Sequence, residues 1–418
     1  MSATTVVGRA RGGRRPGMMV AAGLAAATAL AGCASSGGGK AATPVAPATT
    51  AGSGATTGSG ATAGSGATTA AGAPTTGGGA SSASGTVALL LPESATTRYE
   101  NADRPYFTAA LKEACPACTL AYSNANGSPA TQLQQANAAL ARGAKVLVLD
   151  PEDGTTAGAI VTAAKAKGVP VLSYDRLITG GGDLPQFYIS FDNVKVGQLQ
   201  ATALKDIMTT QGRKGDIVWI NGSPTDNNAT LFKQGAHSVI PTSGFGAYKI
   251  GYEIATPDWV PATAQTEMSA AIAKLGKGNI AGVYSANDGM AATIYQAMSS
   301  AGISPIPPLT GQDAQPDGIQ RILAGQQYMT VYKAIKPEAT AAAQIAVSLL
   351  QGTAPTAPSG LSITQTTDGS TQVPSLLLTP VAVTKDNVKS TVIADGFVKA
   401  SDVCTGAAAA ACTSLGIS

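Results

Sequence analysis

The sequence predicts an α/β protein with two doubly wound parallel-sheet domains. From Gly85 onward, short apolar runs of strand length alternate with Ala-rich amphipathic stretches of helix length. This alternation is typical of βαβ units around a parallel sheet that is covered on both faces. The units are too many for one small sheet, and the roughly 335 residues from Gly85 to the end suffice for two domains.

The apolar runs mark the expected strands. They are TVALLL (86–91), KVLVL (145–149), VPVLSY (169–174), DIVWI (216–220), IAGVYSA (280–286), PPLTG (307–311) and YMTVY (328–332). Helical patterns such as ATQLQQANAALARG and GTTAGAIVTAAKAKG lie between them, and each stops at a Gly. In VKVGQLQATALKDI, apolar residues from Val196 to Ile207 recur at helical spacing.

Residues 1–33 have the organisation of a secretory signal. Four Arg residues precede the apolar run MMVAAGLAAATALAGC, which is too short to span a bilayer comfortably. The run ends in Leu-Ala-Gly-Cys33, which resembles a lipobox, so we expect Cys33 to carry lipid; an ordinary small-residue cleavage site is the alternative. Residues 34–84 are almost wholly Gly, Ser, Ala, Thr and Pro, and we expect a disordered, flexible tether.

The charge balance argues against nucleic acid as a partner. The net charge is +3, and four of the Arg residues lie in the removable signal, so the mature chain is close to neutral. No apolar run after Cys33 is long enough to cross a membrane. We therefore expect a secreted protein that is held at the outer face of the cell membrane by its lipid.

The other four cysteines form two close pairs, Cys115/Cys118 and Cys404/Cys412. Export permits disulfides. A Cys-x-x-Cys can instead be a redox centre, but such thiols are usually activated at a helix N-terminus. Cys115 follows the expected helix YFTAALKEA, where the helix dipole disfavours a thiolate. We expect two local structural disulfides, and a count of free thiols would distinguish the redox alternative.

Polar side chains follow nearly every expected strand. Ligands of open α/β sheets bind at the carboxyl ends of the strands, so these residues form a candidate site. They are Arg98, Tyr99, Asp150, Asp175, Arg176, Asp226, Asn227, Asn228, Asn287, Asp288, Asp313 and Lys333. Taken singly, each Asp or Asn can be a helix cap, and we expect that role for Asp192 and Asp288.

Together, these side chains suit a sugar. Carboxylates accept hydrogen bonds, Arg and Lys donate them, and Asn does both, as does each sugar hydroxyl. The apolar face of a sugar ring also needs an aromatic side chain, and Trp259 lies in the polar loop TPDWVPATA. We expect Trp259 to stack on the ligand, with local loop packing as the alternative.

Catalysis has less support. Asp175 and Asp313 could be paired carboxylates for glycoside hydrolysis, but neighbouring groups would keep each ionised, whereas a general acid needs the reverse. His237 lies inside an expected helix, where a surface or capping role is more common. The sequence has no nucleophile elbow, phosphate loop or metal-ligand spacing. We expect no enzyme activity, no cofactor and no metal.

Five segments resemble a known family. YDRLI, FYISFDNVKVGQLQA, GSPTDNNATLF, the GQDA of 311–314 and MTVYKAI are similar to the D-xylose-binding and multi-sugar aldose-binding proteins of bacterial ABC transporters. These have the type I periplasmic-binding-protein fold, and the resemblance runs from about Thr86 to Phe397. It implies a monomer whose two domains, joined by a three-stranded hinge, close on one sugar and then dock on a membrane permease.

The resemblance also implies the sugar contacts and the domain boundaries. The contacts fall on Arg98, Asp175, Arg176, Asp226, Asn228, Trp259, Asn287, Asp313 and Lys333. Tyr99 stands where relatives carry Trp, and Asp150 is a possible contact. The N-terminal domain would hold 85–193 and 335–377, the C-terminal domain 195–333 and 379–400, with hinges near Asn193–Val194, Ala334 and Thr379. Residues 401–418 form a C-terminal extension with the second cysteine pair.

The leading hypothesis is a lipid-anchored solute-binding protein for a monosaccharide, D-xylose first. A multi-aldose receptor for glucose, galactose or arabinose is the close alternative, and a sugar sensor that signals to a receptor kinase is another. A sugar-responsive repressor would need an N-terminal helix-turn-helix, where this chain has a signal and a tether. A glycosidase would need sugar turnover, and a redox protein would need free thiols.

Overall fold

The computed structural model describes residues 83–368 and 371–418. The expected signal, the tether and Cys33 lie outside these residues. The described residues all belong to one compact unit. Within the described part, no helix is both long and apolar enough to cross a bilayer.

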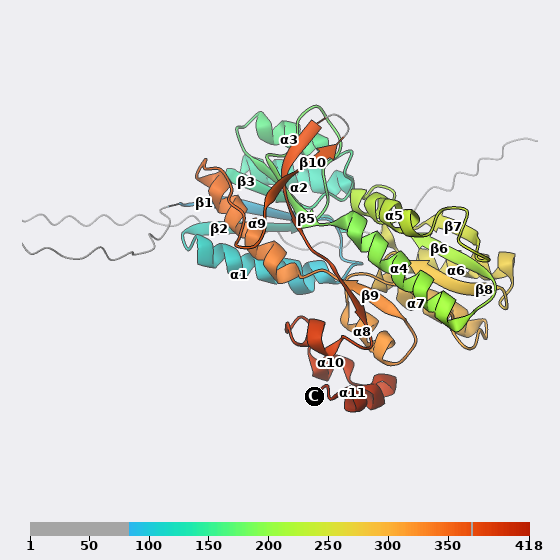
Figure 1. The fold of residues 1–418 in the computed structure, drawn as a ribbon. Coiled ribbons are helices and arrows are strands. Elements are labelled where there is room, and N and C mark those ends of the chain that lie inside the picture. Colours follow the sequence, from blue (N-terminus) through green and yellow to red (C-terminus); the bar gives the residue numbers. More distant parts are fainter. Residues whose placement is uncertain (1–82, 369–370) are drawn as a thin grey trace, which may run out of the picture. The chain divides into compact units, whose positions relative to one another are not determined.

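The larger sheet has seven strands in the order β10-β11-β5-β4-β3-β1-β2 (Figure 1). All neighbouring strands are parallel except the β10–β11 pair. The bounds are β1 (Gly85–Leu91), β2 (Cys118–Asn124), β3 (Ala144–Leu149), β4 (Val171–Tyr174), β5 (Phe187–Phe191), β10 (Ile363–Asp368) and β11 (Thr371–Leu378).

Both faces of this sheet are covered, which explains the continuous apolar runs. On β1, Val87 and Leu89 pack with α1 (Arg104–Ala114) and α9 (Ile335–Leu350). The alternating residues Ala88 and Leu90 pack with helices on the opposite face. Those helices are α2 (Pro129–Ala141) and α3 (Gly158–Lys165).

The second lobe is built on the parallel sheet β7-β6-β8 and the antiparallel pair β12-β9. Its strands are β6 (Asp216–Asn221), β7 (Ile250–Ala255), β8 (Ile280–Ser285), β9 (Met329–Tyr332) and β12 (Val381–Thr384). Its main helices are α4 (Asn193–Gln211), α5 (Asn227–Val239), α6 (Pro261–Leu275), α7 (Asp288–Ser300) and α8 (Pro316–Leu323). The predicted α/β class with parallel sheets is confirmed.

Two glycines let α4 and α5 approach each other closely. A Cβ at Gly197 would lie 1.9 Å from the carbonyl oxygen of Phe232, and one at Gly235 would lie 1.9 Å from that of Val194. The close packing brings the N-terminal ends of the two helices together. There the Asn193 amide donates to Asn228 Oδ1 at 2.7 Å.

The run PPLTG is not a strand. It forms a single bridge, between Val283 and Leu309. Pro307 and Pro308 have no N–H to donate, which prevents a continuous ladder. The run VPVLSY begins its strand only at Val171, directly after another proline.

The chain passes between the two sheets three times. The passages follow β5 at Phe191, follow β9 at Tyr332, and lie between β11 and β12 at residues 379–380. These places agree with the expected hinges, but the domain boundaries themselves remain a prediction.

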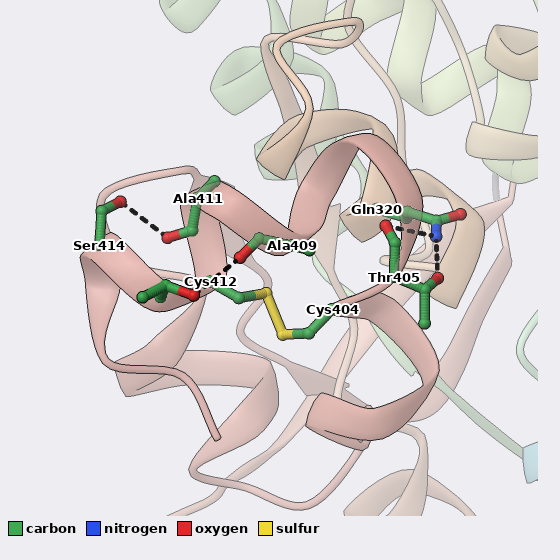
Figure 2. The surroundings of a disulfide bond; sticks show 8 residues. Gln320, Cys404, Thr405, Ala409, Ala411, Cys412 and Ser414 are labelled. Carbon is green, nitrogen blue, oxygen red and sulfur yellow. Dashed lines mark hydrogen bonds between the residues drawn. A yellow bond between two sulfur atoms is a disulfide. The ribbon is translucent and has the colours of Figure 1, made fainter.

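The C-terminal extension packs against α8 and is part of the folded domain. Val403, Ala408 and Ile417 are buried in one cluster with Ile319 and Leu323 of α8. The extension comprises α10 (Ala400–Val403), η4 (Gly406–Ala408) and α11 (Ala409–Leu415). Figure 2 shows the Cys404–Cys412 disulfide that joins α10 to α11, and the Gln320 amide that donates to Thr405 Oγ1 at 2.6 Å. Cys115 and Cys118 form the other disulfide, at the C-terminal end of α1.

Candidate functional site

A small cavity lies between residues of the two lobes. It holds about 20 Å³, which is enough for about one water molecule. Its lining comprises Thr96, Arg98, Tyr99, Asp175, Arg176, Asp226, Asn228, Phe232, Trp259, Asn287, Gln312, Asp313 and Lys333. The structure thus brings together every residue predicted to contact the sugar except Asp150.

One group of charges is centred on Asp175. This residue follows β4 with a φ of 55°, and its N–H donates to the Ile189 carbonyl, which fixes the turn out of the strand. Its carboxylate lies 3.0 Å from Arg98 Nη2 and 3.6 Å from Lys333 Nζ. Burial alone would raise the pKa of Asp175, but Arg98, Lys333 and Arg176 outweigh it and lower that pKa to about 2. Asp175 is therefore a fixed anion at neutral pH.

Asp313 completes this group from the second lobe. Its Oδ1 lies 3.3 Å from Lys333 Nζ and 3.6 Å from Arg98 Nη1. Lys333 follows β9, and Arg98 precedes η1 (Tyr99–Asp103), so three separate chain segments meet here. The two cations and two carboxylates are all nearly inaccessible to solvent.

A second group of charges is centred on Arg176. Its Nε lies 3.1 Å from Asp226 Oδ2 and 3.5 Å from Asp150 Oδ1. Its Nη2 donates to the Tyr99 hydroxyl at 3.0 Å. Asp150 therefore lies behind Arg176 and does not line the cavity. Its position suits the balancing of the guanidinium charge better than contact with a ligand.

Buried carboxyl groups outnumber the buried cations around the cavity. The cations are Arg98, Arg176 and Lys333. The carboxyl groups are Glu93, Asp103, Asp150, Glu152, Asp175, Asp226, Asp313 and Glu338. Burial raises the pKa of Asp150, Asp226 and Glu338, and it raises that of Glu152 to about 8, against the lowering by nearby cations. Burial thus favours the neutral form of these carboxyl groups, which opposes the build-up of buried negative charge.

The start of α5 places two more polar side chains. Asp226 is the N-cap of this helix and accepts from the Asn228 N–H at 2.8 Å, while its other oxygen faces Arg176 and the Trp259 indole. The Asn228 side chain donates to the Asp175 carbonyl at 3.1 Å, across the two lobes. Asp226 is thus both a helix cap and part of the cavity wall.

Aromatic side chains supply the apolar part of the wall. Trp259 has a φ of 56° and is 5% exposed, and its Nε1 donates to Asp226 Oδ2 at 3.1 Å. A Cβ at Gly222 would lie 2.0 Å from its indole ring, so only glycine leaves room for it. Phe232 meets Trp259 edge to face, with 6.4 Å between the ring centroids. The indole is locked in place beside the polar groups.

The N-caps of α4 and α7 agree only in part with those expected from the sequence. Asp192 caps α4 as expected, but Asp288 is not a cap. The N-cap of α7 is Asn287, whose Oδ1 accepts from the Met290 N–H at 2.8 Å. The Asp288 carboxylate instead turns towards the loop that carries Asp313. His237 lies in the last turn of α5, 3.0 Å from the Ile240 carbonyl, and it is not part of the cavity lining.

Several residues of the candidate site were not singled out in the sequence. Glu93 and Glu152 lie just beyond β1 and β3, so the strand-end rule could have found them. Asp103 lies at the end of η1, 3.2 Å from Arg98 Nη2, and Glu338 is buried inside α9; the sequence carries no signal that places either carboxyl group near the cavity. Thr96, Phe232 and Gln312 also line the cavity and were not singled out.

Comparison with known proteins agrees with this architecture. The family model described as "Periplasmic binding protein domain" matches residues 87–354. The D-xylose-binding periplasmic protein of Escherichia coli (strain K12) is 42% identical over 281 residues, which cover 67% of this chain and 82% of that protein. The multiple sugar-binding periplasmic receptor ChvE of Rhizobium radiobacter is 34% identical, over 76% of this chain and 91% of that protein.

A solved structure extends the agreement to three dimensions. It is the carbohydrate transporter solute binding protein from Chloroflexus aurantiacus, in complex with D-glucose. It matches with a TM-score of 0.69 at 31% identity and covers 76% of this chain and 97% of that one. The chain therefore belongs to the periplasmic binding protein family, which consists of extracytoplasmic binding proteins and not of enzymes.

Proposed function

We propose that the protein captures a monosaccharide, D-xylose first, and delivers it to an ABC sugar permease. One observation carries this proposal. Several buried polar atoms of the residues that line the cavity have no hydrogen-bond partner within the described part of the chain. They are the donors Arg98 Nε, Arg98 Nη1 and Arg176 Nε and the acceptors Asp175 Oδ1, Gln312 Oε1 and Asp313 Oδ1.

Arg98 Nη1, Arg176 Nε, Asp175 Oδ1 and Asp313 Oδ1 each lie within 3.6 Å of an opposite charge but make no hydrogen bond. Donors and acceptors without a hydrogen bond in one place suit a ligand that offers both. Buried polar atoms are nearly always paired, so the missing partners are expected to come from a bound molecule. A sugar hydroxyl donates to a carboxylate and accepts from a guanidinium at the same time. Trp259 and Phe232 offer apolar surface for the ring carbons. A polyhydroxylated ring matches this combination better than an anion or an apolar molecule does.

Binding requires the two lobes to move. The cavity is smaller than a sugar ring, and charged groups meet across it, as in the pair Arg98–Asp313 and the pair Arg176–Asp226. Separation of the lobes would expose these groups, and a sugar would enter and replace the direct ion pairs with charge-assisted hydrogen bonds. Closure is then stabilised by contacts that only the closed form makes with the sugar.

D-xylose is the first candidate because the D-xylose-binding relative shares 42% identity with this chain. A multi-aldose receptor is the second candidate. The receptor ChvE covers more of the chain, and the Chloroflexus protein was crystallised with D-glucose. One hydroxymethyl group separates a pentose from a hexose, and such a group is worth only about 1–3 kcal/mol in a binding pocket.

Titration calorimetry with D-xylose, L-arabinose, D-glucose, D-galactose and the open-chain xylitol tests the proposal. We expect binding of at least D-xylose and weaker binding of xylitol, which has no rigid ring for Trp259 to contact. Asn228→Ala should weaken binding about tenfold, because it leaves buried partners unpaired. Asn227→Ala is the matched control, since the neighbouring residue does not line the cavity. The absence of heat with every aldose would refute the sugar proposal.

We also propose that the mature protein is anchored through lipid on Cys33, on the basis of the lipobox-like residues that precede it. The tether of residues 34–84 would then keep the sugar-binding part close to its permease at high effective concentration. Cys33→Ala should move the protein from the membrane fraction to the soluble fraction. Unchanged membrane association would contradict the lipid anchor.

A further inference from the structure

The loop that carries Asp313 has a strained backbone. Asp313 has a φ of 92° and Ala314 a φ of 52°. Left-handed conformations are disfavoured for residues with a Cβ, and alanine has no side-chain polar group to compensate. Such strain persists only where the surroundings hold it. The position of the Asp313 carboxylate in the cavity therefore depends on the groups that bind this loop.

Three successive N–H groups of the loop are held by partners in the second lobe. The N–H of Asp313 donates to the Val331 carbonyl at 2.9 Å. The N–H of Ala314 donates to Thr330 Oγ1 at 3.2 Å, and that of Gln315 donates to Asp288 Oδ2 at 2.9 Å. The Thr330 hydroxyl in turn donates to the same Asp288 oxygen at 2.9 Å. Two of the three anchors thus converge on Asp288.

Two glycines and several hydrogen bonds hold the Asp288 carboxylate in place. A Cβ at Gly311 would lie 2.0 Å from Asp288 Oδ1, and one at Gly318 would lie 2.5 Å from Oδ2. Two glycines that flank the Asp313 loop therefore leave space for one carboxylate. Gln327 Nε2 donates to Oδ1 at 2.6 Å, and Arg321 Nη2 donates to the Asp288 carbonyl at 2.7 Å. Asp288 is completely buried but does not line the cavity.

We propose that Asp288 is a positioning residue for ligand binding, which holds the strained Asp313–Ala314 turn so that the Asp313 carboxylate faces the ligand. Asp288 acts through Gln315 and Thr330 and has no contact with the ligand itself. This inference rests on the proposed sugar-binding function, because it takes Asp313 to be a ligand contact. It adds that the affinity for the sugar depends on Asp288, a residue outside the cavity.

The test is a double-mutant comparison with D-xylose as the probe, measured by calorimetry together with the melting temperature. Asp288→Ala removes the acceptor for two anchors of the loop. Thr330→Val keeps the shape of the side chain but removes the hydroxyl, so it remains informative if Asp288→Ala does not fold. Asp288→Asn keeps one oxygen that can accept from Gln315 and Thr330. Met208→Ala is the control, because Met208 is buried in the core of the same lobe against Gly282 and does not line the cavity.

We expect Asp288→Ala and Thr330→Val each to weaken D-xylose binding about tenfold or more, as the loss of buried hydrogen bonds predicts. Asp288→Asn should retain most of the affinity. Met208→Ala should lower the melting temperature and leave the affinity unchanged. In an Asp313→Ala background, Asp288→Ala and Thr330→Val should cause no further loss of affinity, because the group that they position is absent.

Two results would overturn the inference. If the variants weaken binding equally with and without Asp313, or in neither background, Asp288 does not act through Asp313. If Asp313→Ala alone leaves binding of D-xylose unchanged, Asp313 is not a ligand contact, and the proposed binding site is wrong as well. The first result leaves the proposed function intact, so the two failures can be told apart.

Discussion

Replacement of Asp175 by Asn tests the charge network most directly, since it removes one negative charge and keeps the size of the side chain. Asp175 lies 3.0 Å from Arg98 and 3.6 Å from Lys333. At an effective dielectric constant of about 20, each of these attractions is worth about 5 kcal/mol. The nearby carboxylates of Asp103 and Asp313 compensate part of this loss. We therefore expect the free energy of unfolding to fall by about 3–5 kcal/mol, the usual effect of breaking a buried pair.

The same change should weaken D-xylose binding about a hundredfold, or by about 2.7 kcal/mol, because two cations that face the ligand lose their shared anion. Urea unfolding measures the first effect and calorimetry the second. The matched control is Asp183→Asn, which removes a surface carboxylate paired with the exposed Lys165 and should change neither quantity. Affinity and stability of Asp175→Asn that equal those of Asp183→Asn would refute the proposed role of the network.

Three further predictions concern other parts of the molecule. Trp259→Phe should abolish the change in fluorescence on sugar binding. Trp219→Phe should keep it, because the Trp219 ring is stacked on the Tyr284 ring with 4.4 Å between centroids and does not line the cavity. A sugar response that persists in Trp259→Phe would place the ligand elsewhere. The pKa of Glu152 is raised by burial to about 8, so the folded state binds a proton that the unfolded state releases above about pH 5, and stability should fall from pH 5 to pH 8. Glu152→Gln should reduce that fall by about 3 kcal/mol in urea unfolding, and an unchanged pH slope would show that Glu152 is ionised in the folded protein. Replacement of both Cys404 and Cys412 by Ser should lower the free energy of unfolding by about 2 kcal/mol, because a disulfide that closes a loop of sequence separation 8 restricts the unfolded chain; equal urea midpoints for this variant and the parent would contradict it.

The α/β class was readable from the sequence because β1, β3, β4, β6, β8 and β9 are short apolar runs separated by helices. The strands β2, β5, β7, β10, β11 and β12 were not among those expected. The strand that sequence analysis placed wrongly, 307–311, contains two prolines, and a count of apolar residues does not register the missing N–H donors. The packing of residues 401–418 on α8 was also not foreseen. Buried alanines such as Ala408 and Ala411 are weak signals of a core, and only the three-dimensional contacts reveal their partners.

The cavity residues were predictable to the extent that they follow strands. Asp175, Arg176 and Asp313 stand directly after expected strands, and the topology of an α/β sheet places them at one edge. The roles of single residues were less accessible. Asn287 and Asp288 are adjacent, and the sequence alone suggested that the Asp was the cap. Which of two neighbouring side chains caps the helix depends on the direction of each side chain, which spacing does not determine.

The ion pairs across the cavity change what a ligand competes with. In an open, water-filled groove, a weak ligand needs only to displace solvent. A ligand of this cavity would have to displace a guanidinium from a carboxylate, as at the 3.1 Å contact of Arg176 with Asp226. A molecule that satisfies only some of the freed charges leaves the others buried without partners, and the protein's own pairing is then the better alternative. The internal ion pairs would thus compete with the ligand. A solute that forms too few hydrogen bonds to replace them would bind weakly.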